Sequence, residues 1–278
     1  MAFKTSPYAK AFLKAVRWIL PIYALAGILV YHFQDRIFFR PVAVPMDHHY
    51  MFGMPYMERN IRFRDDANLS LVEFPVADQK PRGIVLYLHG NRANIGWYVE
   101  HVVGFHRNGY EVWMIDYPGY GKSTGPMETD VLFAYAMQMY KLARKKVSAD
   151  SIIIYGKSLG TGIAAWLASR QPSGRLILEA PYYSLSSLAT SRLPIFPWER
   201  MLRIRLDTWA YLQTVTVPVT IFHGTNDGMI PYRNAVRLKS VLKAGDAFVT
   251  VPGGSHRDLG RFTEYRAVMD SLLSIVRQ

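Results

Sequence analysis

The chain has 278 residues, which is enough for one large domain or two small ones. Half of the residues are hydrophobic and 14% are aromatic, so the chain has material for a sizeable core and is not globally disordered. It contains no cysteine, which excludes disulfides, thiolate metal sites and a cysteine nucleophile. The net charge is +12, but no nucleic-acid-binding motif accompanies it, so we expect no nucleic-acid partner and rank anionic lipid above it.

The N-terminal segment is apolar and flanked by basic residues. Residues 18–33 carry no formal charge, and residues 1–17 carry basic residues without an acidic one. We interpret residues 1–34 as an uncleaved, single-pass membrane anchor. A cleaved signal peptide, with Ala24-Leu25-Ala26 as the cleavage site, and a buried soluble helix are the alternatives. The positive-inside rule then predicts a cytoplasmic N-terminus and a catalytic domain on the periplasmic or lumenal side.

Residues 35–278 have the pattern of one α/β domain. Two strands over 61–63 and 69–74 are expected to pair antiparallel. Short apolar runs then alternate with amphipathic segments, which predicts a mainly parallel eight-stranded sheet with helices on both faces. The further predicted strands are 83–88, 110–115, 151–155, 175–179, 218–222 and 247–251, and the predicted helices are 95–108, 131–146, 162–168, 232–243 and 262–276.

A long insertion precedes the strand predicted at 218–222. Residues near 182–216 hold several prolines and aromatic side chains, and a segment of this length between neighbouring strands is usually functional. We interpret it as a small helical lid. A plain peripheral helix pair is the alternative.

The stretch Gly156-Lys157-Ser158-Leu159-Gly160 lies between a predicted strand and a predicted helix. This is the sequence context of a nucleophile elbow, in which a sharp turn exposes a serine hydroxyl at the end of a sheet. We therefore expect Ser158 to be a nucleophile. The alternative is a glycine-rich turn with an incidental serine.

A serine nucleophile needs a general base and an acid that orients the base, in the chain order serine, acid, histidine. Asp227 follows the strand predicted at 218–222, and His256 follows the one at 247–251. We therefore assign His256 as the base and Asp227 as its orienting acid. Glu179 and Asp258 remain rival acids.

Two backbone N–H groups are expected to stabilise the oxyanion of the tetrahedral intermediate. One belongs to Leu159, the residue after the nucleophile, and the other to Asn91 or, alternatively, Arg92 in the loop after the strand at 83–88. We expect His89 to shape this loop. We expect His223, a rival base, to flank the end of its strand.

Five motifs in order carry a family resemblance. They are Leu88-His89-Gly90-Asn91, Asp116-Tyr117-Pro118-Gly119-Tyr120-Gly121-Lys122-Ser123, Gly156-Lys157-Ser158-Leu159-Gly160, His223-Gly224-Thr225-Asn226-Asp227 and Gly253-Gly254-Ser255-His256. Over residues 60–278 and the anchor, the chain resembles the membrane-anchored α/β-hydrolase-domain proteins, a group that includes protein depalmitoylases. The resemblance implies hydrolysis of esters, thioesters or amides through an acyl-enzyme, without a cofactor. From the residues themselves we expect no metal site.

The combined prediction is a serine hydrolase that cleaves ester or thioester bonds of small-molecule or lipid-like acyl substrates. A peptidase or amidase with the same triad is one alternative, because specificity depends on pockets and not on the triad. A non-catalytic, membrane-tethered binding protein is the other. The acyl group and the oligomeric state are left open.

Overall fold

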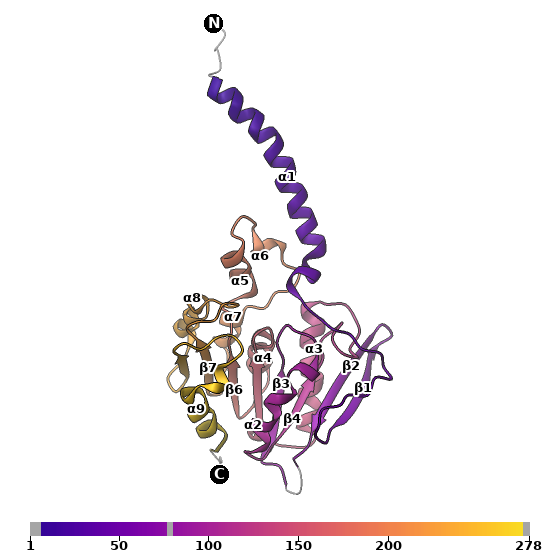
Figure 1. The fold of residues 1–278 in the computed structure, drawn as a ribbon. Coiled ribbons are helices and arrows are strands. Elements are labelled where there is room, and N and C mark those ends of the chain that lie inside the picture. The colour runs from indigo at the N-terminus through magenta and orange to yellow at the C-terminus, as the bar shows by residue number, and fades with distance from the viewer. Residues whose placement is uncertain (1–6, 77–79, 275–278) are drawn as a thin grey trace.

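The computed structural model describes residues 7–76 and 80–274. An eight-stranded sheet lies at its centre, with strand order β1-β2-β4-β3-β5-β6-β7-β8 (Figure 1). The strands are β1 (Met57–Arg64), β2 (Ala67–Phe74), β3 (Gly83–Leu88), β4 (Tyr110–Ile115), β5 (Ile152–Lys157), β6 (Arg175–Glu179), β7 (Val219–Gly224) and β8 (Ala247–Val251). β1 pairs antiparallel with β2 and β2 antiparallel with β4, while all other pairings are parallel. The predicted mainly parallel sheet is confirmed.

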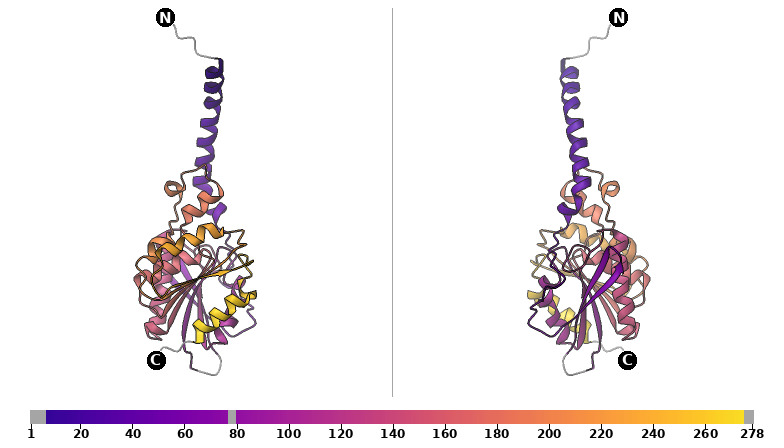
Figure 2. Two further views of the ribbon diagram at one scale, coloured as in Figure 1. Left: turned by 90° about the vertical axis from the view of Figure 1, so that its left-hand side faces the viewer. Right: turned by 90° about the vertical axis from the view of Figure 1, so that its right-hand side faces the viewer.

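The central strands are mostly apolar because both faces of the sheet are covered. Every residue of β3, β5, β6 and β7 is buried. One face packs against α3 (Thr129–Arg144) and α4 (Gly160–Arg170), and the other against α2 (Val102–His106) and α9 (Thr263–Ser274), as Figure 2 shows. The part of the predicted closing helix at 275–276 lies outside the described residues.

Two predicted helices are shorter or less regular than expected. The segment predicted as one helix over 95–108 forms 3₁₀ turns at Ile95–Trp97 and Val99–His101 before α2. Gly96 and Gly104 within it weaken a continuous helix, because glycine loses more backbone entropy than other residues. The segment predicted at 232–243 forms α8 (Tyr232–Ala235) followed by a 3₁₀ stretch at Val236–Val241.

The N-terminal helix α1 (Pro7–Phe38) is continuous and projects away from the domain (Figure 1). Its segment Val16–Phe38 has 23 residues and a mean hydropathy of 1.5, and it is the helix within the described residues that is long and apolar enough to cross a membrane. At 1.5 Å per residue it measures about 35 Å, which exceeds the roughly 30 Å hydrocarbon core of a bilayer. The helix is longer than the uncharged run 18–33, and it passes the predicted boundary at residue 34 without a break.

The predicted lid forms α5 (Leu185–Arg192), α6 (Trp198–Met201) and α7 (Thr208–Leu212). The tip between α5 and α6 packs along α1. Phe196 stacks on Tyr23 with ring centroids 5.3 Å apart, and the Tyr23 hydroxyl donates a hydrogen bond to the carbonyl oxygen of Ile195 (2.7 Å). A Cβ on Gly27, one helical turn along, would lie 3.6 Å from the Phe196 ring. The tip of the insertion therefore lies beside the apolar part of α1.

Polar contacts join the lower end of α1 to the same insertion. The buried amide of Gln34 donates to the carbonyl oxygen of Met201 (3.1 Å) and accepts from the N–H of Arg203 (2.8 Å). Asp35 forms an ion pair with Arg203. These contacts explain why the helix continues beyond the uncharged run: its polar last turns have partners in the folded domain.

Candidate active site

Ser158 lies on a strained turn between β5 and α4. Its φ is +52°, a left-handed conformation that is uncommon for a residue with a side chain. Its N–H donates to the carbonyl oxygen of Glu179 at the end of β6 (2.9 Å). Two glycines permit the turn, since a Cβ on Gly160 would lie 2.0 Å from the carbonyl oxygen of Leu88, and one on Gly156 would lie 2.7 Å from that of Gly160. The strand, turn and helix predicted around Ser158 are therefore present, with the strain expected of a nucleophile elbow.

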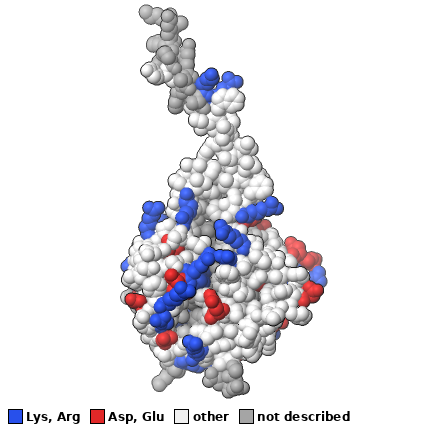
Figure 3. Space-filling view, in the orientation of Figure 1, with Lys and Arg blue, Asp and Glu red and all other residues white. Residues whose placement is uncertain are grey.

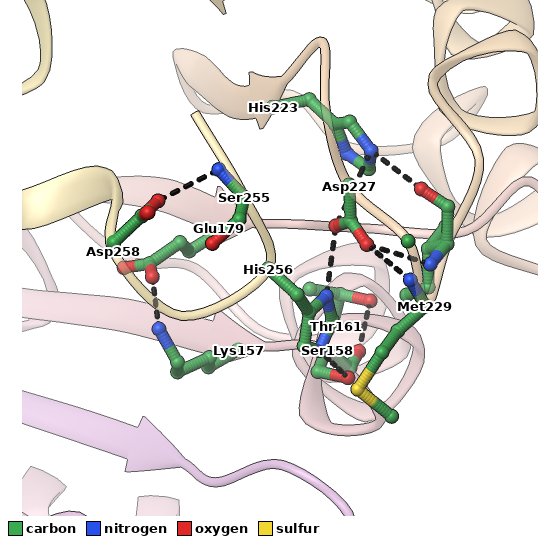
Figure 4. A network of polar contacts seen from close by, with 12 residues as sticks. Lys157, Ser158, Thr161, Glu179, His223, Asp227, Met229, Ser255, His256 and Asp258 are labelled. Atoms are coloured by element: carbon green, nitrogen blue, oxygen red, sulfur yellow. Dashed lines mark hydrogen bonds and ion pairs between the residues drawn. The ribbon is translucent and has the colours of Figure 1, made fainter. Parts of the chain in front are cut away.

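Three side chains that are far apart in sequence meet beyond the carboxyl ends of the strands (Figure 4). The Ser158 hydroxyl lies 2.9 Å from His256 Nε2, and His256 Nδ1 lies 2.8 Å from Asp227 Oδ2. Asp227 and His256 are buried, and Ser158 is half-buried at the base of a cavity. The structure therefore brings together the serine, histidine and aspartate assigned from the sequence.

Asp227 is held as a carboxylate. Its second oxygen, Oδ1, accepts hydrogen bonds from the N–H groups of Met229 and Ile230, both at 2.8 Å. Burial alone would raise the pKa of Asp227, but the hydrogen bond and charge of His256 and the Ile230 N–H outweigh burial, and the net pKa is lowered. Because an ionised Asp227 only accepts hydrogen bonds, the proton between the two side chains belongs to His256 Nδ1, and Nε2 of the neutral imidazole faces Ser158 as an acceptor.

The two rival acids are engaged elsewhere (Figure 4). Glu179 pairs with the buried ammonium of Lys157 and accepts a hydrogen bond from Tyr155. Burial would raise the pKa of Glu179, but the charge of Lys157 and these hydrogen bonds lower it below its usual range. Asp258 accepts from the N–H of Ser255 (2.7 Å) and so fixes the turn that precedes His256.

His223 lies behind Asp227. Its Nε2 is 2.9 Å from the carbonyl oxygen of Ile230 and 3.6 Å from Asp227 Oδ2. Burial lowers the pKa of His223, which favours the neutral ring. It therefore flanks the end of β7, as expected, and supports the loop that carries Asp227.

Asn91 lines the same cavity, and Leu159 directly follows Ser158 in the chain. Neither N–H donates a hydrogen bond to any other residue that the structure describes. The Asn91 side chain is fixed: its Oδ1 accepts from the Tyr120 hydroxyl (2.7 Å) and the Arg40 N–H (3.2 Å), and its Nδ2 donates to the carbonyl oxygen of Phe38. These bonds tie the loop to the end of α1, a connection that sequence reasoning missed.

The segment 116–123 packs against this loop, and none of its residues lines the cavity at Ser158. The Tyr117 hydroxyl donates to the carbonyl oxygen of His89 (2.8 Å), and Asp116 Oδ1 lies 3.2 Å from His89 Nε2. Both residues are fully buried, as is His89. A Cβ on Gly90 would lie 2.8 Å from the Tyr98 hydroxyl, so the loop is packed too tightly for a larger residue there. His89 therefore lies buried within the loop that we expected it to shape.

The cavity at Ser158 encloses about 200 Å³. Its apolar wall comes from α1 and two loops, with the side chains Ile37, Phe38, Trp97 and Met229. None of the insertion's residues lines it, so the segment predicted as a lid packs against α1 and not over Ser158. Across the described ranges, no group of three or more His, Asp or Glu side chains is arranged to hold a metal ion.

Comparisons with known proteins extend these observations. Residues 79–203 match a family model described as serine aminopeptidase, S33. An uncharacterized protein of Mycobacterium tuberculosis is 26% identical over 262 residues, which is 91% of this chain and 93% of that protein. The α/β-hydrolase domain-containing protein aho-3 of Caenorhabditis elegans is 29% identical over 209 residues, covering 69% of this chain and 59% of that protein.

Solved structures give the same picture of the architecture. An esterase of Pyrococcus furiosus superposes with a TM-score of 0.64 at 17% identity, over 85% of this chain and 97% of that chain. A 2,6-dihydroxy-pseudo-oxynicotine hydrolase superposes with a TM-score of 0.66 at 18% identity, over 81% of this chain and 69% of that chain. At these identities the likeness is one of fold.

Proposed function

Because the chain has the α/β-hydrolase fold, we propose that it is a membrane-anchored serine hydrolase that cleaves ester or thioester bonds of acyl substrates. Its hydrolase character rests on the family model and on the esterase neighbours. The assignment as a serine hydrolase rests on one observation: Asp227 contacts His256, which contacts Ser158, and Ser158 lies on a turn with a positive φ. A binding protein has no need of that strained serine.

The first chemical step follows from the proton positions. Ser158 Oγ attacks the acyl carbonyl carbon while His256 Nε2 takes the hydroxyl proton, and Asp227 stabilises the resulting imidazolium. The carbonyl oxygen becomes an oxyanion, for which the N–H groups of Leu159 and Asn91 are the donors. Collapse of the tetrahedral intermediate breaks the bond to the leaving alcohol or thiol, which departs with the proton from His256.

The second step regenerates the enzyme. Water attacks the acyl-Ser158 ester, and His256 Nε2 takes a proton from that water. The same two N–H groups stabilise the second oxyanion. Collapse releases the carboxylic acid and returns the proton to Ser158 Oγ, so that each turnover consumes one water and forms one acid and one alcohol or thiol.

The placement at a membrane rests on α1 and on its junction with the cavity. The exposed apolar side chains of α1 lie between the basic residues Lys14 and Arg17 at one end and the folded domain at the other. In the proposed topology the N-terminus is cytoplasmic and the domain lies on the periplasmic or lumenal side. Ile37 and Phe38 end the helix and also form the cavity wall, so Ser158 lies next to the bilayer, where lipid-like acyl substrates are found.

Hydrolysis of p-nitrophenyl acetate and butyrate by the full chain in detergent tests the assignment. Ser158→Ala should lower kcat by about 10⁴-fold or more, because the acyl-enzyme cannot form. Thr161→Ser is a matched control outside the triad: its hydroxyl donates to the Ser158 carbonyl oxygen (2.6 Å), a bond that serine retains. Equal rates for wild type and Ser158→Ala would refute the proposal.

A peptidase or amidase is the second candidate, favoured by the description of the matching family model. The same proton relay through His256 can protonate a leaving amine. Aminoacyl p-nitroanilides and p-nitrophenyl esters of the same acyl groups separate the two. We expect the ratio of ester to anilide turnover by the enzyme to exceed the ratio of the intrinsic chemical reactivities of the two bonds. Preferential cleavage of the anilides would make the second candidate correct.

A further inference from the structure

The charges that line the cavity at Ser158 are all positive. They are Lys157, Arg40, Arg92 and Arg257, and no carboxylate belongs to the lining. Lys157 is buried and neutralised by Glu179. The three arginines have no carboxylate within 4.0 Å among the residues that the structure describes. Uncompensated positive charge therefore surrounds the proposed nucleophile.

The three arginines reach the cavity from three separate parts of the chain. Arg40 follows α1, Arg92 lies in the loop beside Asn91, and Arg257 directly follows His256. Figure 3 shows Lys and Arg side chains forming a band across the face of the domain below α1. Convergence of this kind means that the fold concentrates positive potential at one opening, which attracts anions to it.

The guanidinium groups are positioned to bind rather than to support the fold. Arg92 Cζ lies 4.2 Å from the centroid of the Trp97 ring, a stacking that holds the guanidinium plane and leaves its N–H edge available. The side chains of Arg40 and Arg257 donate no hydrogen bond within the described part of the chain. Guanidinium groups bind phosphate and carboxylate through paired N–H donors.

The size of the cavity means that part of a drug-sized substrate lies outside it. About 200 Å³ is less than the roughly 300–1,000 Å³ of pockets that enclose whole drug-sized ligands. An acyl substrate therefore enters only in part, with its reacting carbonyl at Ser158 and its remaining groups over the rim. The rim carries the exposed side chains of Arg40, Arg92 and Arg257.

We infer that the substrate is an amphiphile with an anionic head group, phosphate or a similar anion, which the three arginines bind while Ser158 attacks the acyl carbonyl. The inference rests on the proposed serine hydrolase function and names its substrate class. The arginines distinguish an acyl ester with a phosphate from one without it. The same chemistry is offered by the head groups of an anionic bilayer, and the experiment separates these two sources.

The test compares two esters that differ only in a phosphate, 1-lauroyl-glycerol-3-phosphate and 1-lauroyl-glycerol, with the full chain in neutral detergent micelles. Each hydrolysis adds one water and releases lauric acid. We expect kcat/KM to be about 100-fold higher for the phosphate ester. Arg40→Gln and Arg257→Gln should each lower this ratio about tenfold. Arg92 is not used, because its backbone is part of the proposed oxyanion loop.

Arg233→Gln is the matched control. It removes the same charge from an exposed position on α8, outside the cavity, and should leave the ratio unchanged. A wild-type ratio near one, or a ratio that all three variants lower equally, would overturn the inference. If neither ester is hydrolysed, protection of Ser158 from a fluorophosphonate probe by dodecyl phosphate and by dodecanol gives the same comparison, and equal protection overturns it.

A second arm identifies the source of the anion. Hydrolysis of 1-lauroyl-glycerol is measured in phosphatidylcholine vesicles with and without phosphatidylglycerol. If the arginines bind the bilayer surface and not the substrate, phosphatidylglycerol will accelerate the wild type but not Arg40→Gln or Arg257→Gln, and the micelle ratio will be near one. That result overturns the inference but leaves the hydrolase function intact. Failure of a fluorophosphonate to label Ser158 would instead refute the proposed function.

Discussion

Asp227, the proposed orienting acid of His256, offers a sharp test of the proposed mechanism, because two different substitutions separate its roles. Asp227→Asn keeps an oxygen that can accept from the N–H groups of Met229 and Ile230, but its amide can donate to His256 Nδ1. That hydrogen bond requires the tautomer in which Nε2 carries the proton. Ser158 then faces a donor in place of a base.

The size of the effect follows from these bonds. We expect Asp227→Asn to lower kcat by about 10³ to 10⁴-fold, which is about 4–5.5 kcal/mol in the barrier. Its free energy of unfolding should change by about 1 kcal/mol or less, because both backbone hydrogen bonds are retained. Asp227→Ala leaves those two N–H groups without their acceptor, at a cost of about 2–4 kcal/mol in unfolding free energy.

The assay measures p-nitrophenyl butyrate turnover and urea unfolding of the wild type and both variants. The account predicts similar losses of kcat for the two variants and a clear loss of stability only for Asp227→Ala. Near wild-type turnover by a folded Asp227→Asn would show that Asp227 does not orient the base. Glu179 or Asp258 would then have to be reconsidered.

Four further outcomes are expected. Glu179→Gln should lower the free energy of unfolding by about 3 kcal/mol in urea titrations, because it leaves a buried lysine without its counter-ion, and an unchanged value would contradict the buried pair. Asp227 and Glu179 both have lowered pKa values, so the stability that they contribute is present above their unfolded pKa values of about 4. That stability should be lost as the pH falls below those values. Thermal unfolding measured between pH 6 and pH 3 should show a Tm that falls by on the order of 1 °C or more from one pH step to the next. Gly160→Ala should cost about 3 kcal/mol or more because its Cβ meets a β3 carbonyl oxygen, whereas Gly104→Ala meets nothing within 4 Å and should be neutral or stabilising by up to about 1 kcal/mol, and equal effects would refute the packing argument. Deletion of residues 1–33 should release the protein from the membrane fraction on cell lysis and carbonate washing, and full retention there would contradict the anchor.

Strands and motif order could be predicted because local sequence decides them. β3, β4, β6 and β8 have the bounds expected from their mostly apolar runs, since strands covered by helices are rich in apolar residues. The positions beyond the ends of β5, β7 and β8 follow from the same pattern, because parallel strands present their carboxyl ends at one edge. Ser158, Asp227 and His256 could therefore be placed near each other before any distance was known.

Contacts between distant segments could not be predicted. The sequence left Asp227, Glu179 and Asp258 as candidate acids, and only the fold shows that Glu179 turns toward Lys157. Charges at residues 35 and 36 marked the end of the apolar run, yet the helix continues because Asp35 pairs with Arg203, 168 residues later. No sequence pattern near Asp35 indicates that its partner is Arg203.

The insertion shows the same limit of local reasoning. Its length and its aromatic residues favoured a lid, and the same features suit a segment that packs along an apolar helix. The stacking of Phe196 on Tyr23 and the edge-to-face contact of Trp198 with Phe38 decide for the latter. The apolar wall of the cavity comes from the end of α1 and two loops, and not from the insertion.

The central claim is that Ser158 is a nucleophile activated by His256. Mass spectrometry of the full chain after reaction with a fluorophosphonate measures this directly. The account predicts one phosphonyl adduct on the peptide that contains Ser158, none in Ser158→Ala, and labelling slowed by about 10³-fold or more in His256→Ala. An adduct on another residue, or equally fast labelling of His256→Ala, would contradict it.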